Sequence, residues 1–192
     1  MNVCKLAAIA ILAGVSSHAA ECNVVVRIHE TVPVPWIVSV RAQSRAAEMF
    51  REIGVSTRWH TGGSKVSGDD RSCGAPIDVE FQNTSAGYRM SPDTLGYAAP
   101  YADTGTCIHI FMDRVHKQND QLTAAVLAHV LVHEIGHVLE RVSRHSAEGV
   151  MKAHWGVGES RDMLSRTLQF APEDVELIHR GIAGRVAMTA SR

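Results

Sequence analysis

The spacing of apolar residues changes along the chain, and each spacing predicts a different kind of element. Segments that are rich in β-branched residues, or that alternate apolar with polar positions, are typical of strands. They cover residues 23–29, 55–59, 77–81 and 107–112. A shorter strand is predicted at 95–99, between two prolines. A polar stretch rich in Gly and Ser, residues 61–75, predicts a surface loop.

Helical spacing of apolar residues appears at 37–53, at 121–140 and at 171–183, and a short helix is predicted at 163–170. Gly54 ends the first helix, and Pro172 begins the last one. The segment 121–140 is apolar nearly all round, which indicates a helix buried inside the protein. Strands come first and helices dominate later, so the sequence predicts an α+β fold.

The first 20 residues have the pattern of a secretory signal peptide. Lys5 precedes an apolar run at 6–15, and Ser17 and Ala19 are small residues where a signal peptidase reads them. The run is shorter than the ~20 residues of a membrane span, and we expect no span in the mature chain. We therefore expect a signal peptide at 1–20 and one domain at 21–192, secreted or periplasmic. The alternative is a retained anchor helix.

Charge and cysteine content narrow the possible partners and the redox environment. The net charge is −1 and no basic stripe occurs, so nucleic acid is not an expected partner. After cleavage three cysteines remain, Cys22, Cys73 and Cys107. An exported chain meets oxidising conditions, so we expect one disulfide and one free thiol. The sequence leaves the pairing open, as it does the oligomeric state.

The segment His133–His137 reads H-E-I-G-H inside the apolar helix. Residues four apart lie on one face of a helix, so His133 and His137 can bind the same Zn²⁺ ion. Glu134 lies beside them and is the expected general base that takes a proton from a metal-activated water. A buried acid without a metal or partner nearby would be costly, which favours this interpretation over a structural role.

A catalytic zinc needs a third protein ligand from outside the motif. His145 is the first candidate because a turn after Arg141 would bring it back over the metal. Glu148 and Asp162 are the alternatives, since carboxylates also bind zinc. His129 continues the same helix face, but it is too far along the axis to share one ion, and we interpret it as a buried, hydrogen-bonded histidine.

These residues resemble the zincin metallopeptidases, and among them the metzincins, which carry H-E-x-x-H-x-x-G-x-x-H and a downstream methionine turn. Met151 resembles the methionine of that turn, although plain core packing explains a methionine equally well. The sequence departs from the pattern at two positions. Glu140 replaces the glycine and Ser143 replaces the third histidine, so His145 comes two residues late.

The chain is also similar, over nearly its whole mature length, to a group of exported bacterial proteins of acidobacterial type. The matching motifs are His145-Ser146, Gly149-Val150-Met151, Trp155, the 95–98 segment and the 113–115 segment. The resemblance implies a zincin-like fold, with a twisted mixed sheet, a long buried active-site helix and a smaller C-terminal helical part. It also implies that an edge strand at 95–99 aligns an extended peptide.

Together these features predict an exported zinc metalloendopeptidase with one catalytic Zn²⁺ and a peptide or protein substrate. Two alternatives stay open. The chain could bind zinc without catalysis, as a structural or interaction domain. It could also be a zinc hydrolase that acts on a cell-wall amide. The subsite preference and the group that stabilises an oxyanion are not readable from the sequence.

Overall fold

Alternation of buried and partly exposed residues builds a five-stranded sheet in the computed structural model, which describes residues 22–62, 71–84, 90–98 and 107–190. The strands are β1 (Asn23–Glu30), β2 (Ser56–Thr61), β3 (Ile77–Gln82), β4 (Gly96–Ala98) and β5 (Cys107–Phe111). The helices are α1 (Trp36–Glu52), α2 (Met112–Val115), α3 (Asp120–Glu140), α4 (Val157–Asp162) and α5 (Pro172–Ala190).

The strand order is β2-β1-β3-β5-β4. The first four strands in this order are parallel, whereas β4 pairs antiparallel with β5 and forms one edge of the sheet. On β3, Ile77, Val79 and Phe81 are completely buried, while the residues between them are partly exposed. One face of the sheet therefore belongs to the core, and the other carries polar side chains.

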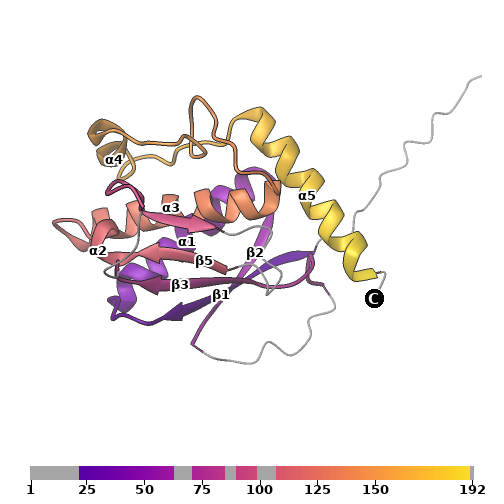
Figure 1. Cartoon of the computed structure of the whole chain (residues 1–192), viewed down its shortest axis with the longest axis horizontal. Coiled ribbons are helices and arrows are strands. Elements are labelled where there is room, and N and C mark those ends of the chain that lie inside the picture. Colours follow the sequence, from indigo (N-terminus) through magenta and orange to yellow (C-terminus); the bar gives the residue numbers. More distant parts are fainter. Residues whose placement is uncertain (1–21, 63–70, 85–89, 99–106, 191–192) are drawn as a thin grey trace, which may run out of the picture.

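Helices α1 and α3 pack on each other over the apolar face of the sheet (Figure 1). Helix α3 is long and apolar enough to cross a membrane by length and composition, but 89% of its most apolar window is buried inside the protein. It therefore has the environment of a core helix. Helix α5 packs against α3, and the segment with α4 lies on the side of α3 away from the sheet (Figure 1).

The predicted architecture is confirmed: this is an α+β fold with a mixed sheet, a long buried helix and a C-terminal helical part. The strand predicted at 95–99 appears as β4, and its last residue lies outside the described residues. The predicted signal peptide at 1–20 also lies outside them. Cys22 pairs with Cys73, and Cys107 is the free thiol of the described chain.

The short helix predicted at 163–170 is wrong. The structure has a helix just before it, α4, and then a turn and an extended segment. Backbone groups of this segment bond to distant parts of the chain: Leu168 N–H donates to His129, and Gln169 accepts from Val150 N–H. Met163 and Phe170 are buried, so the apolar pattern reflects anchoring to the core and not a helix face.

Candidate metal centre

Helix α3 presents His133 and His137 on one face, as their spacing predicts. Each ring is oriented by a backbone carbonyl: His133 Nδ1 lies 2.9 Å from Val150 O, and His137 Nδ1 lies 3.3 Å from Val142 O. If each Nδ1–H donates to its carbonyl, both Nε2 lone pairs face inward, and these two atoms lie 3.1 Å apart. Two facing lone pairs repel unless a cation lies between them, so this arrangement fits a metal ion.

The chain reverses directly after α3 and brings His145 to the same place. Arg141 adopts the left-handed conformation with φ of 60°, and its N–H donates to His137 O, which ends the helix. The ring of His145 lies 5.3 Å from that of His133 and 5.0 Å from that of His137, measured between centroids. One nitrogen from each of the three rings lies within 4.8 Å of the others.

The two carboxylate alternatives do not join this cluster. Glu148 is exposed, and Asp162 forms an ion pair with Arg166 at 2.6 Å. Among the three candidates, His145 is therefore the one whose position suits a third ligand. Three imidazoles match the ligand number and type of a catalytic zinc site that keeps one position open.

A buried carboxylate on α5 holds the loop that carries His145. Asp174 is fully buried and accepts hydrogen bonds from Arg144 at 2.6 Å and from Ser146 at 2.5 Å. These two residues flank His145 in the sequence. The second carboxylate oxygen of Asp174 accepts from Ala171 N–H at the start of α5. The Asp174 carboxylate therefore fixes α5 and the histidine loop to each other. Such outer contacts orient a metal ligand without touching the metal.

Met151 lies against Gly136 of α3, which directly precedes His137 in the sequence. It is fully buried, and a Cβ built on Gly136 would meet its Sδ at 2.6 Å. Gly136 therefore leaves the space that the methionine side chain fills between the two histidines of α3. Ser146 N–H donates to Met151 O, which ties this turn back to the His145 loop. The role of Met151 as a methionine turn stays a prediction, because plain core packing gives the same burial.

Burial keeps the histidines of the cluster neutral. It lowers the pKa of His133 to about 3, and it also lowers the pKa values of His137 and His145. The neighbouring rings add to the effect, because a first positive charge disfavours a second. Neutral imidazole is the form that binds a metal, so the site requires little deprotonation at neutral pH.

Glu134 lies on the same turn of α3, where 6% of the residue is exposed. Burial raises the pKa of its carboxyl to about 8. A Cβ built on Gly96 would lie 3.4 Å from Glu134 Oε1, so the carboxyl lies against the edge strand β4. A cation at the histidine cluster would favour the ionised carboxylate, which is the form that accepts a proton.

His129 has the structural role that its position on α3 predicts. Its Nδ1 lies 2.7 Å from Ala125 O, and its Nε2 accepts from Leu168 N–H at 3.0 Å. Both ring nitrogens are thus occupied by backbone groups. Trp155 contacts the rings of His129 and His133 edge-on, at 6.2 and 5.6 Å between centroids, and forms an aromatic wall beside the cluster.

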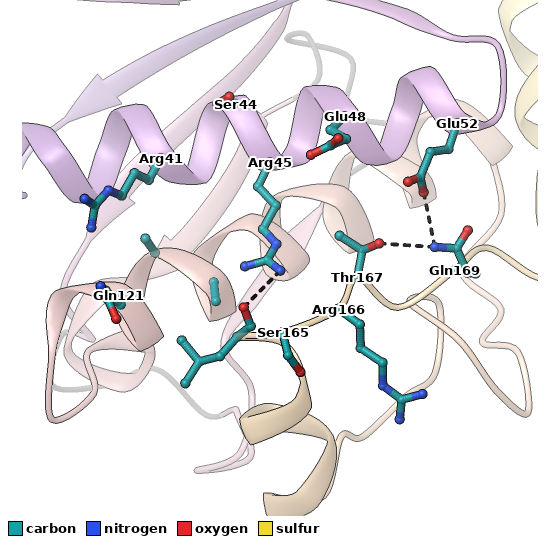
Figure 2. A pocket seen from close by; sticks show the side chains of 13 residues that line it. Arg41, Ser44, Arg45, Glu48, Glu52, Gln121, Ser165, Arg166, Thr167 and Gln169 are labelled. Carbon is teal, nitrogen blue, oxygen red and sulfur yellow. Dashed lines mark hydrogen bonds between the residues drawn. The ribbon is translucent and has the colours of Figure 1, made fainter.

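A separate cavity of about 730 Å³ lies between α1, the beginning of α3 and residues 164–169 (Figure 2). Its wall carries mixed charges, including Arg45, which donates to Leu164 O, and Glu52, which accepts from Gln169. The cavity is lined by none of the clustered histidines, nor by Glu134. The metal-ligating groups converge at the histidine cluster and not in this cavity.

The chain has a zincin-like α+β fold, and its long helix α3 carries two residues of the histidine cluster. Among solved structures, archaemetzincin from Methanopyrus kandleri has a similar fold, with a TM-score of 0.56 and 15% sequence identity. The alignment covers 84% of this chain and 96% of that one. No protein-family model and no curated protein matches the chain. At this identity the likeness concerns the fold alone.

Sequence reasoning missed the groups that support the histidines. The carbonyls of Val142 and Val150 carry no side-chain signal, so no pattern could single them out. Asp174 lies in the first turn of a helix, where the helix dipole favours an acid even on the surface. Its presence there therefore gave no reason to expect a buried side chain. Its contacts with the His145 loop depend on tertiary structure.

Proposed function

We propose that this chain is an exported zinc-dependent metallopeptidase that hydrolyses internal peptide bonds. The observation that carries the proposal is the convergence of His133, His137 and His145 on one point, next to the buried carboxyl of Glu134. Zinc bound by these imidazoles supplies a Lewis acid that acidifies a water molecule and polarises the substrate carbonyl. One catalytic ion per chain fits the ligand set.

The residues of this chain perform the remaining tasks. Glu134 accepts the water proton at its carboxylate and returns it to the leaving amine, which is general base followed by general acid catalysis. The carbonyls of Val142 and Val150 keep the two α3 imidazoles in the tautomer that directs Nε2 inward. Trp155 and the apolar surroundings of α3 shield His133 and His137 from bulk water, whereas His145 is exposed.

Strand β4 supports a peptide as the substrate. It is the edge strand of the sheet, and Gly96 on it lies next to Glu134. An extended peptide that pairs with this edge would pass the carboxyl and the histidine cluster, with main-chain hydrogen bonds providing alignment. Export rests on the sequence pattern of residues 1–20, which we propose as a cleaved signal peptide before a single domain at 21–192.

The test is cleavage of a broad peptide library by the zinc-loaded protein. We expect cleavage that a chelator abolishes and that added zinc restores. Glu134→Gln should lower turnover by at least about 100-fold while it keeps the metal, because general acid–base catalysis typically contributes 10²–10⁴-fold. Full activity of Glu134→Gln would contradict the assignment of the general base.

The two alternatives correspond to other outcomes of the same experiment. Zinc-loaded protein that cleaves no library peptide and no cell-wall fragment would indicate a zinc-binding protein without catalysis. Release of products from peptidoglycan fragments, without cleavage of library peptides, would indicate a hydrolase of a cell-wall amide. The closer similarity to the acidobacterial-type group is a prediction that an alignment with those proteins would test.

A further inference from the structure

A second group of metal-ligating side chains lies on the polar face of the sheet, opposite to the face that α1 and α3 cover. It consists of Glu80 on β3 and of Cys107 and His109 on β5. The two strands are neighbours, and Glu80 is the register partner of His109. One ligand atom from each residue lies within 4.8 Å of the others.

The donor set of this group differs from that of the histidine cluster. A thiol, an imidazole and a carboxyl together form a set typical of zinc and similar divalent transition metals. Cys107 is available for this role because Cys22 and Cys73 bond to each other. Within the described part of the chain, its Sγ makes a weak contact with Ile108 O at 3.9 Å.

His109 has a ring nitrogen without a satisfactory partner. Its Nδ1 is buried and makes no hydrogen bond with the described residues, although Glu80 Oε2 lies 3.3 Å away. Buried polar atoms are normally paired, so an unpaired one beside a carboxyl needs an explanation. The ring is held in place by Tyr97, which stacks on it with centroids 4.8 Å apart and planes inclined by 19°.

The Glu80 carboxyl also favours a cation at this group, because its ligand atom lies within 4.8 Å of the thiol and imidazole ligand atoms. A divalent cation would displace the thiol proton to solvent and bind the thiolate.

We propose that Glu80, Cys107 and His109 bind a second zinc ion, or a similar divalent transition metal, that links β3 to β5. Bonds of about 2.0–2.3 Å in a tetrahedral arrangement place ligand atoms roughly 3.3–3.8 Å apart. The observed spacing of up to 4.8 Å closes by side-chain rotation on two hydrogen-bonded strands. Asp78 is held by Arg27 and His29, so the three-residue set leaves a fourth position to water.

Cobalt(II) substitution tests this proposal, because only a thiolate ligand gives a sulfur-to-cobalt charge-transfer band in the near ultraviolet. The full chain, purified without thiol reductant and stripped of metal, is titrated with cobalt(II) alone. We expect the band in the wild type and in His145→Ala, and its loss in Cys107→Ser. Glu80→Gln and His109→Gln should weaken cobalt binding at this site by at least about 10-fold.

His29→Gln is the matched control, since His29 lies on β1 as the register partner of Glu80 while its ring contacts Asp78. It should keep the band. Absence of the band in the wild type, or a band that persists in Cys107→Ser, would overturn the proposal. The outcome is independent of the proposed peptidase, because His145→Ala removes a histidine of the other cluster and leaves this site intact.

Discussion

Replacing Gly181 by alanine tests the packing that holds α5 against the end of α3. A Cβ built on Gly181 would lie 1.7 Å from Leu139 O and 2.9 Å from the carbonyl carbon of the same residue. Both obstacles are backbone atoms of a buried helix, so no side chain can rotate away. To restore a normal contact of ~3.5 Å, the two helices must separate by roughly 1.8 Å.

The magnitude follows from two opposing terms. Overpacking of this kind costs about 3 kcal/mol when the surroundings cannot yield. Alanine in place of glycine inside a helix returns about 1 kcal/mol. The net loss in free energy of unfolding is then about 2 kcal/mol, which lowers Tm by roughly 4–8 °C for a chain of this size.

Gly184 on the same helix provides the matched control. A Cβ there would approach only the flexible Arg141 Nη1, at 3.6 Å, so Gly184→Ala should raise Tm by roughly 2–4 °C. Thermal unfolding followed by circular dichroism at one fixed pH and zinc concentration measures both variants. Equal Tm values for the two variants would refute the inferred contact between α5 and Leu139.

Three further predictions address the support of the metal centre, the disulfide and pH. Asp174→Asn should weaken zinc binding by about 10–100-fold because it loosens the His145 loop. The control Glu173→Gln, whose side chain is 72% exposed, should bind zinc as the wild type does. Equal zinc affinities of Asp174→Asn and the wild type would contradict the role of Asp174 in supporting the loop. Replacing both Cys22 and Cys73 by serine should lower the free energy of unfolding by up to about 4 kcal/mol, the chain-entropy value for a separation of 51 residues. Urea unfolding measures this loss, and an unchanged urea midpoint would contradict it. Burial, with Asp174 nearby, raises the pKa of the Glu140 carboxyl from 4.5 to about 7. Between these two pH values the folded state keeps the proton and the unfolded state loses it, so the free energy of unfolding falls as pH rises. Glu140→Gln should remove this pH-dependent loss of stability, worth roughly 3 kcal/mol at most, so in urea titrations at pH 8 it should be more stable than the wild type. Parallel pH profiles of stability for the two proteins would contradict the prediction.

The regular elements that position the site could be predicted because each has a one-sided or fully apolar pattern. Alternation at β3 and the nearly all-round apolar pattern of α3 correspond directly to the core of the sheet and to the buried helix. The pattern at 163–170 misled for a physical reason. Its apolar residues anchor an extended segment whose backbone hydrogen bonds go to other parts of the chain, and sequence spacing does not record such partners.

The candidate site also has one part that the sequence predicts and another part that it does not. His133, Glu134 and His137 follow from helical spacing, and His145 was the first choice for the third ligand because the chain had to turn after α3. The turn itself was not predictable in detail, since Arg141 adopts a left-handed conformation that favours glycine. Asp174 holds the His145 loop from α5 through Arg144 and Ser146, which lie 30 and 28 residues earlier, and its position in the first turn of a helix gives no sign of these contacts.

Zinc affinity of the histidine cluster tests the central claim most directly. Equilibrium dialysis is carried out on Cys107→Ser protein, which lacks the thiol of the second cluster, with and without His145→Ala. We expect one zinc ion per chain in the first protein. In the second, affinity should fall by at least about 100-fold, because even outer contacts of a metal ligand are worth 10–100-fold. Equal zinc affinity of the two proteins, with unchanged circular dichroism, would contradict the three-histidine site.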